Sequence, residues 1–287
     1  MTSRPPGSLQ PVTPREVRIA WSSLREIFAE HADAGIAGWI RETEPHFRHQ
    51  HEHALSRLDA GIDLLTYCEL AESLPERRVD VLDIGAGNGG VALAFANCSR
   101  YRVHAIDLAP NTVLYAVKRA TAIPLNHAVG TGHALPYADA SFDIALLIDT
   151  IEHVSNPRRL GAEIMRVLRP GGFCMVSTVA RLRFFFRRDP HFGIRGLVML
   201  PNSLQRFVVN RIARRRNMGH GGCHSPAYDV EHIFWNRQEI GRLFPGAAEV
   251  AALYSWPVDP NAKPPTKEWL RWHLRDYVFD HVRIRKG

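Results

Sequence analysis

From Val79 onwards, short apolar runs alternate with segments of helical periodicity, and this alternation restricts the fold more than any other feature of the chain. Strands that alternate with helices form a parallel sheet that helices cover on both faces. We therefore expect an α/β protein built on a mostly parallel sheet. The expected strands are 79–84, 101–107, 125–130, 141–149, 173–179, 247–256 and 278–286.

The regions around this alternation differ in composition. Residues 1–14 are polar and Pro-rich, which predicts a disordered tail. Residues 15–77 have helical periodicity and predict an N-terminal helical cap. Residues 78–287 hold the sheet, and within them the alternation stops over residues 180–231. We expect this stretch to be an insertion after the fifth strand, on the side where a substrate binds.

The formal net charge of +7 is concentrated in that insertion. Between Arg181 and Arg216 there are ten arginines and one acid, Asp189, so this segment carries +9 and the remainder of the chain −2. The basic character therefore belongs to one segment and not to the predicted sheet.

The remaining composition favours a cytoplasmic protein. No stretch of 18 apolar residues predicts a membrane-spanning helix, and the first residues lack the apolar core of a signal peptide. The four cysteines are scattered without a CxxC pair, which suits a reducing compartment and argues against a structural zinc site.

A Gly-rich turn follows the first expected strand and opens a helix, in the sequence Asp83-Ile-Gly-Ala-Gly-Asn-Gly-Gly90. Glycines permit a tight turn and a close approach to a ligand, and a helix N-terminus favours anionic or polar groups. Asp107 ends the next strand, where an acid would bind a ribose diol. Taken alone, this pattern predicts NAD binding as well as it predicts any other nucleoside cofactor.

Three features distinguish between these cofactors. Asp83 lies two residues before the first glycine, where it would repel a pyrophosphate and attract a cationic amino group. The sequences His133-Ala-Leu-Pro-Tyr137 and Leu168-Arg-Pro-Gly-Gly172 precede the fourth and fifth strands. With VLDIGAGNGG and HAIDL, these motifs over about residues 79–180 closely resemble class I methyltransferases that use S-adenosylmethionine (AdoMet). The resemblance implies a Rossmann-like, seven-stranded sheet, AdoMet as methyl donor and S-adenosylhomocysteine as product.

The resemblance also implies roles for individual residues. Asp83 would lie near the amino group of AdoMet, and Asp107 would accept hydrogen bonds from the ribose. Many relatives carry an acid that contacts the adenine amino group at the position of Thr131, so its hydroxyl or the following backbone would replace that acid. The implied cofactor-binding residues are Asp83, Gly85, Ala86, Gly87, Asn88, Gly89, Asp107, Leu108, Gly132, His133 and Asp149.

The sequence Asp149-Thr-Ile-Glu-His153 lies where the transferred methyl group is expected. Transfer to oxygen needs in-line positioning and removal of a hydroxyl proton. We therefore regard His153 and Asp149 as candidate catalytic residues, with His153 as the base. The alternative interpretation is that His153 only braces the loop.

We expect no metal ion, but one metal-dependent alternative is open. The pattern of Asp149, Glu152 and His153 is similar to the metal-binding motif of small-RNA 2′-O-methyltransferases and of ubiquinone-pathway O-methyltransferases. His191 or His232 would complete such a site for Mg²⁺, Mn²⁺ or Zn²⁺. A further group, His220, Cys223 and His224, is more typical of a Gly-rich loop than of a metal site.

The basic insertion leaves the acceptor open. In the sequence of the insertion, Leu204, Phe207, Val208 and Ile212 form one face of a helix that Asn202 or Ser203 would cap. This face would pack on the domain, while the arginines would lie in water, bind a phosphate-bearing acceptor, or contact an anionic membrane through residues 203–216. Nucleic acid is disfavoured, because no RNA-binding module accompanies the arginines.

The expected acceptor is a small hydroxylated compound. Residues 189–201 are weakly similar to an insertion in methyltransferases of bacterial polysaccharide and natural-product pathways, which favours a saccharide. Two alternatives are open. One is a methyltransferase at the membrane surface that acts on a lipid-linked substrate, and the other is a metal-dependent RNA 2′-O-methyltransferase. The oligomeric state is left open. The histidines at 46, 49, 51 and 53 are expected in a solvated turn.

Overall fold

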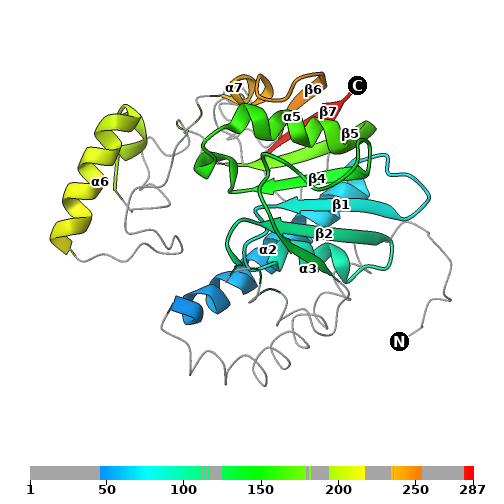
Figure 1. Cartoon of the computed structure of the whole chain (residues 1–287), viewed down its shortest axis with the longest axis horizontal. Helices are drawn as coiled ribbons and strands as arrows, with labels where there is room; N and C mark the ends of the chain where they lie inside the picture. Colours follow the sequence, from blue (N-terminus) through cyan, green and yellow to red (C-terminus); the bar gives the residue numbers. More distant parts are fainter. Residues whose placement is uncertain are drawn as a thin grey trace, which may run out of the picture. The chain divides into compact units, whose positions relative to one another are not determined.

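The predicted α/β fold with a mostly parallel, seven-stranded sheet is confirmed. The strands follow one another in the order β3-β2-β1-β4-β5-β7-β6 (Figure 1). Residues 1–45, and with them the expected tail and much of the cap, lie outside the described residues. The computed structural model describes residues 46–110, 113, 116, 125–178, 181, 194–216, 234, 236–253 and 281–287.

The described residues belong to two compact units, which divide at Val129 and Gly130. In unit 1, β1 pairs in parallel with β2, and β2 pairs in parallel with β3. Every residue of β1 is buried, and its Asp80 carboxylate binds the Arg102 guanidinium at 2.5 Å. Unit 1 contains α2 (His46–Ala71), β1 (Val79–Ile84), α3 (Gly90–Ala96), β2 (Tyr101–Asp107) and β3 (Asn126–Val129).

Helix α2 packs closely on α3 at Gly61. A Cβ atom at Gly61 would lie 2.7 Å from the Cβ atom of Ala94 and 2.9 Å from the Cα atom of Val91. The helix also corrects one expectation, because it begins at His46 and includes the His-rich stretch that was predicted as a turn. Pro45 precedes the helix and no Gly or Pro follows before Gly61, so nothing in this stretch interrupts helical hydrogen bonding.

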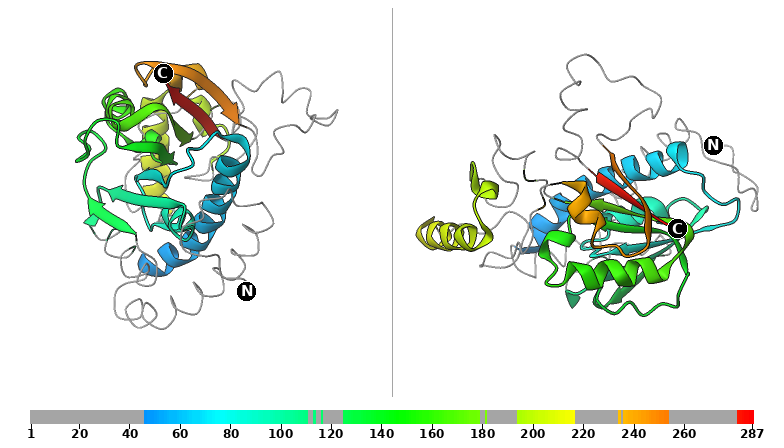
Figure 2. Two further views of the ribbon diagram at one scale, coloured as in Figure 1. Left: turned by 90° about the vertical axis from the view of Figure 1, so that its right-hand side faces the viewer. Right: turned by 90° about the horizontal axis from the view of Figure 1, so that it is seen from above.

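Unit 2 continues the sheet and ends it with two antiparallel pairs. β4 and β5 are parallel, whereas β7 lies antiparallel between β5 and β6 (Figure 2). Unit 2 contains β4 (Phe142–Ile148), η1 (Ile151–His153), α5 (Pro157–Val167), β5 (Leu168–Ser177), η3 (Leu197–Met199), α6 (Asn202–Arg216), α7 (Arg237–Gly241), β6 (Ala247–Leu253) and β7 (His281–Lys286).

The Arg-Pro-Gly-Gly segment lies inside β5 and not in a separate turn before it. Leu168 already pairs with Phe142, and the register then shifts as far as Phe173. The bulge is stabilised by the Arg169 guanidinium, which donates to the Asp143 carboxylate at 2.9 Å. Gly171 has a φ of 76°, a conformation that glycine adopts without strain. The segment therefore joins the strand as a bulge.

The predicted helix in the insertion is confirmed as α6, but its packed face differs from the prediction. Gln205 and Val209 are buried at 0% and 1% exposure, whereas Leu204 and Phe207 are 43% and 60% exposed. Val209 packs with Leu197, and Val208 lies against the same cluster. Of the expected apolar face, Val208 therefore packs on the unit while Leu204 and Phe207 are exposed. The side chain of Gln205 is buried in their place.

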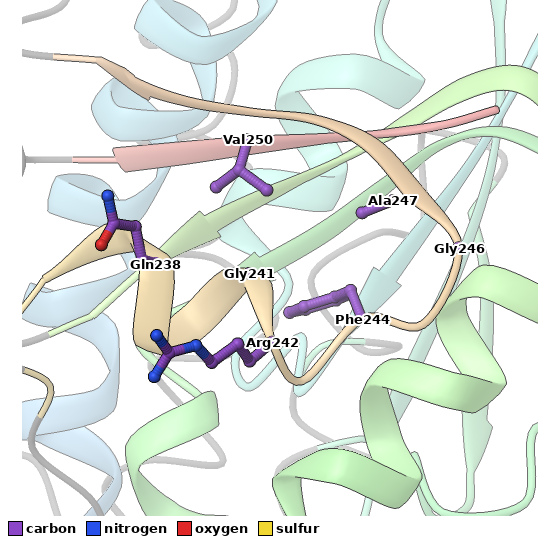
Figure 3. Close-up of a pocket in the computed structure, with 7 residues that line it drawn as sticks. All are labelled: Gln238, Gly241, Arg242, Phe244, Gly246, Ala247 and Val250. Atoms are coloured by element: carbon purple, nitrogen blue, oxygen red, sulfur yellow. The ribbon is translucent and has the colours of Figure 1, made fainter.

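A shallow hollow of about 410 Å³ lies between α7 and the edge strand β6 (Figure 3). The two elements meet at Gly241, where a Cβ atom would lie 2.8 Å from a methyl carbon of Val250. None of the predicted site residues contributes to it. It is lined by Gln238, Gly241, Arg242, Phe244, Gly246, Ala247 and Val250.

Candidate functional site

The Gly-rich turn of unit 1 adopts a backbone conformation that only glycine tolerates without strain. Gly85, Gly87 and Gly89 have φ angles of 70°, 54° and 77°. The turn is fixed to the neighbouring strand, because the N–H groups of Gly85 and Ala86 both donate to the carbonyl of Ile106. The backbone of this predicted cofactor turn is therefore formed in the protein alone.

The side chain of Asp107 connects the turn to the carboxyl end of β2. Its Oδ2 atom accepts from the Gly87 N–H at 2.8 Å, and its Oδ1 atom accepts from the Ala109 N–H at 2.8 Å. Each carboxylate oxygen can accept more than one hydrogen bond, so both retain capacity for the hydroxyls of a ribose. The carboxylate thus holds Gly87, and the ribose contact expected of it stays a prediction.

Asp83 is a buried acid with an unused acceptor. The residue is 2% exposed, and its Oδ2 atom has no hydrogen-bond partner within the described part of the chain. Burial and, to a smaller extent, the nearby Asp107 carboxylate raise the pKa of Asp83 to about 7, against smaller opposing effects of Arg57 and the Ala92 backbone. Such an acceptor suits a ligand that carries a cationic amino group, as AdoMet does.

Two apolar side chains are exposed at adjacent strand ends in unit 1. Leu108, predicted to lie against adenine, is 73% exposed, and Val129 at the end of β3 is 54% exposed. Val129 pairs with Asp107 in the strand register. Val129 was not among the predicted site residues, although its place near the carboxyl end of the expected strand 125–130 is a signal that could have indicated it. Both side chains offer apolar area to a planar base.

Asn88 and Gly89 complete the turn. The Asn88 side chain is buried and its Oδ1 atom accepts from the Gly90 N–H at 3.3 Å, so it stabilises the start of α3. A Cβ atom at Gly89 would lie 2.9 Å from the Cε1 atom of His127. His127 is half-buried, its Nε2 atom has no partner among the described residues, and desolvation lowers the pKa of His127 to about 4. A neutral imidazole therefore lies against the turn at Gly89.

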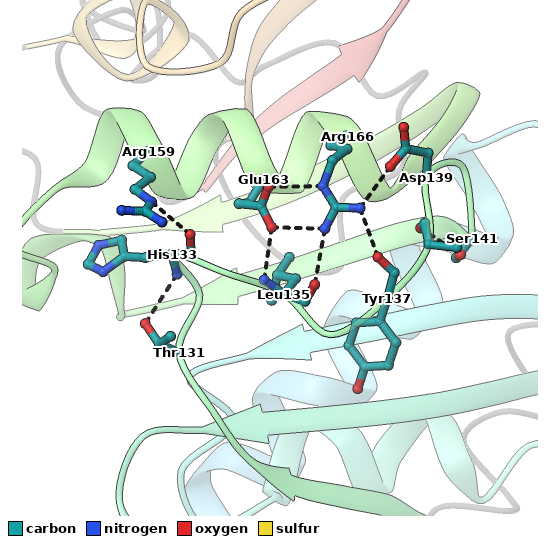
Figure 4. A network of polar contacts seen from close by, with 10 residues as sticks. Thr131, His133, Leu135, Tyr137, Asp139, Ser141, Arg159, Glu163 and Arg166 are labelled. Carbon is teal, nitrogen blue, oxygen red and sulfur yellow. Dashed lines mark hydrogen bonds and ion pairs between the residues drawn. The ribbon is translucent and has the colours of Figure 1, made fainter.

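In unit 2, the segment 131–141 carries two further predicted cofactor residues, Gly132 and His133 (Figure 4). The hydroxyl oxygen of Thr131 accepts from the His133 N–H at 3.2 Å, so it closes the turn around Gly132. The His133 carbonyl accepts from the Nε of Arg159 at 2.9 Å. Thr131 thus has a structural role in this turn, at the position where relatives carry an acid.

The remainder of this segment is held by an ion-pair network that the sequence did not reveal. The Arg166 guanidinium on α5 donates to the carbonyls of Leu135 and Tyr137 at 3.0 and 2.8 Å. It also binds the carboxylates of Asp139 and Glu163, both at 2.8 Å, and Glu163 accepts from the Leu135 N–H at 2.8 Å. Of this network, the sequence indicates only the ion pair between Glu163 and Arg166, through their i, i+3 spacing on a helix.

The Asp-Thr-Ile-Glu-His sequence follows β4 directly. Asp149 is exposed and has a φ of 46°, a strained value for a residue with a Cβ atom. Its carboxylate accepts a hydrogen bond from the Ser177 hydroxyl at the end of β5. His153 is half-buried at the end of η1. The two candidate catalytic residues therefore lie in one short segment after the strand, with Asp149 fixed by a neighbouring strand.

Glu152, the third residue of the suggested metal motif, is 1% exposed and accepts from the Thr178 hydroxyl at 3.0 Å. Among the residues that the structure describes, no group of three His, Cys, Asp or Glu side chains is arranged to hold a metal ion. The suggested additional ligands His191 and His232, and the group of His220, Cys223 and His224, lie outside the described residues.

The helices that the structure describes include none with the length and apolar character needed to cross a membrane.

Comparison with known proteins agrees with this geometry. Residues 82–176 match a family model described as a methyltransferase domain. Uncharacterized methyltransferases of Mycolicibacterium gilvum and Mycobacterium marinum are 39% identical over 101 and 97 residues, which are 35% and 34% of this chain. The matches span only 39% and 38% of the length of those relatives.

A solved structure shares the fold. It is the complex between the Haloferax volcanii Trm112 methyltransferase activator and a protein described there as a methyltransferase. The TM-score is 0.50 at 18% identity, over 84% of this chain and 95% of that one. At this identity the likeness concerns the fold alone, whereas the family model identifies the domain and implies AdoMet as its methyl donor.

Proposed function

We propose that this chain, which contains a class I AdoMet-dependent methyltransferase domain, transfers the methyl group of AdoMet to a hydroxyl oxygen of a small acceptor such as a saccharide or a natural product. The observation that carries the proposal is the buried, unpartnered carboxylate oxygen of Asp83 beside a preformed glycine turn. A buried acceptor without a partner is costly unless a ligand satisfies it.

Each residue around the turn suits one part of the cofactor. Asp83 binds the amino group, Asp107 accepts from the ribose hydroxyls, and Leu108 and Val129 cover the adenine. When bound, AdoMet supplies a methyl group that the sulfonium already activates. The protein therefore has to position the acceptor in line with the methyl carbon and remove one proton.

His153 is the proposed base in this reaction. The acceptor oxygen forms a bond to the methyl carbon while the carbon–sulfur bond breaks and leaves S-adenosylhomocysteine. The hydroxyl proton of the acceptor passes to the His153 imidazole. Asp149 supports this step from the same segment, because the Ser177 hydroxyl fixes its carboxylate.

The cofactor part of the proposal is tested by calorimetric titration of the full chain with S-adenosylhomocysteine. We expect binding by the parent protein and a loss of at least about tenfold in affinity for Asp83→Asn, because a neutral amide cannot pair with the ammonium group. Glu76→Gln is the matched control, since Glu76 is an exposed acid in the same unit as Asp83. Stabilisation by NAD and not by AdoMet would refute the proposal.

The acceptor part is tested by following S-adenosylhomocysteine formation with a panel of saccharides and other hydroxylated compounds. His153→Gln should lower kcat with little change in cofactor affinity. Activity that chelation abolishes and RNA alone supports would favour the metal-dependent alternative instead. Cofactor binding without turnover on any acceptor would indicate a binding protein.

A further inference from the structure

Helix α6 presents an apolar and basic face that the described residues of unit 2 leave exposed. Leu204 and Phe207 are 43% and 60% exposed, and Arg211, one turn further along, is also exposed. Positions 204, 207 and 211 share one side of a helix, because they are spaced three and four residues apart. The sequence of α6 has five arginines and no acid.

The opposite face of α6 is firmly attached to unit 2. The Gln205 side chain donates to the Leu200 carbonyl at 2.7 Å, and Val209 is buried against Leu197. The turn before the helix is held by the buried Arg181, whose guanidinium donates to the carbonyls of Val198 and Leu200. The exposed face therefore belongs to a helix with a fixed inner side, and its exposure does not come from a detached segment.

We propose that this face of α6, around Leu204, Phe207 and Arg211, binds the surface of an anionic lipid bilayer. Helices that lie in the membrane interface combine bulky apolar side chains with Arg or Lys and few acids. The apolar pair enters the headgroup boundary, while the arginines bind lipid phosphates. Fifteen residues give a length of about 22 Å, which is too short to cross a bilayer, so the helix lies parallel to the surface.

The charge of α6 argues against the competing occupants. A second copy of the same helix would bring one arginine-rich segment against another, with no acid in the sequence of either to pair with the arginines. A nucleic-acid duplex would satisfy the arginines through its phosphates but would leave the apolar side chains of Leu204 and Phe207 against a charged backbone. An anionic bilayer matches both the charge and the exposed apolar area. The proposal does not depend on the methyltransferase reaction.

The test is co-sedimentation of the full chain with vesicles of phosphatidylcholine, with and without phosphatidylglycerol. We expect binding only to the anionic vesicles, and weaker binding as salt is added. The double variant Leu204→Ser with Phe207→Ser should bind at least about tenfold less. The single variant Phe207→Trp should bind as well as the parent, because Trp suits the membrane interface.

The control for charge is Arg158→Glu, an exposed arginine on α5, compared with Arg211→Glu on α6. Both change the net charge equally, so only Arg211→Glu should reduce binding. Thermal melting confirms that each variant is folded. Equal binding to neutral and anionic vesicles would overturn the proposal, as would full binding by the double serine variant. RNA binding by the same proteins is measured in parallel. If the double serine variant lost RNA binding but kept its vesicle binding, the membrane proposal would be overturned in favour of nucleic acid.

Discussion

The hydroxyl of Thr178 donates a hydrogen bond of 3.0 Å to the carboxylate of Glu152, which is only 1% exposed. Thr178 directly follows β5, and Glu152 lies in η1 after β4. The neighbouring pair, Ser177 and Asp149, repeats the same arrangement between the same two segments. Two hydroxyls thus hold two acids of the predicted catalytic segment, which makes this connection a candidate for control of both stability and catalysis.

Thr178→Val tests the first of these connections. Valine has a similar shape but cannot donate, so a buried carboxyl group loses a hydrogen bond at a cost of about 1–3 kcal/mol. Urea denaturation of the parent, the Val variant and Thr178→Ser measures this cost. The Ser variant retains the hydroxyl and should recover part of the lost stability. Equal stability of the Val variant and the parent would show that the bond contributes nothing.

Gly89→Ala and Gly87→Ala separate backbone strain from crowding. Both positions have positive φ, so an alanine costs about 1–2 kcal/mol at either. At Gly89 the new Cβ atom also meets His127 at 2.9 Å, whereas at Gly87 nothing lies within 4 Å. Gly89→Ala should therefore destabilise the cofactor-free protein more, in chemical denaturation. The additional substitution His127→Ala should recover the difference, and its failure to do so would contradict the crowding explanation.

The fold could be predicted because its signals are local. β1, β2 and β4 are short apolar runs, and strand and helix periods alternate between them. The backbone of the Gly-rich turn was predictable for a similar reason, since its glycines with positive φ lie within one stretch of chain. The prediction for the His-rich start of α2 was wrong because it relied on composition. The stretch is polar, as turns are, but it contains no residue that breaks a helix.

The interactions that were missed depend on tertiary contacts. Nothing in the sequence indicates that Arg166 holds the carbonyls of Leu135 and Tyr137, since backbone carbonyls carry no sequence signal. Periodicity also placed Phe207 on the packed face of α6, but the position of Val209 against Leu197 decides which face is buried. A polar Gln205 on the inner side is unexpected until its bond to the Leu200 carbonyl is seen.

Arg166→Ala should loosen the segment 131–141 without unfolding the protein. The guanidinium holds two carbonyls and two carboxylates, and alanine removes all four contacts. We expect faster amide hydrogen exchange over 131–141 and a higher KM for AdoMet, because Gly132 and His133 are predicted to contact the cofactor. Arg158→Ala on the same helix is the matched control. Unchanged exchange in Arg166→Ala would show that α5 does not order this segment.

The raised pKa of Asp83 predicts how the stability of the cofactor-free protein depends on pH. The folded protein raises this pKa from 3.8 to about 7, so it holds the proton more tightly than the unfolded chain. The contribution of Asp83 to folding is therefore fully present below about pH 4 and is lost as the pH rises through about 7. A buried ionised carboxylate without a partner for Oδ2 is the physical reason.

Asp83→Asn should remove this dependence, because an amide does not titrate. Melting temperatures of the cofactor-free parent and variant, measured from about pH 5 to about pH 8, should diverge as the pH rises, with the variant becoming the more stable protein. Saturating S-adenosylhomocysteine should reduce the divergence by stabilising only the parent, since its amino group pairs with the ionised acid. Parallel curves for the two cofactor-free proteins would mean that Asp83 is ionised at little cost, and its role as the site for a cationic group would then lose its physical basis.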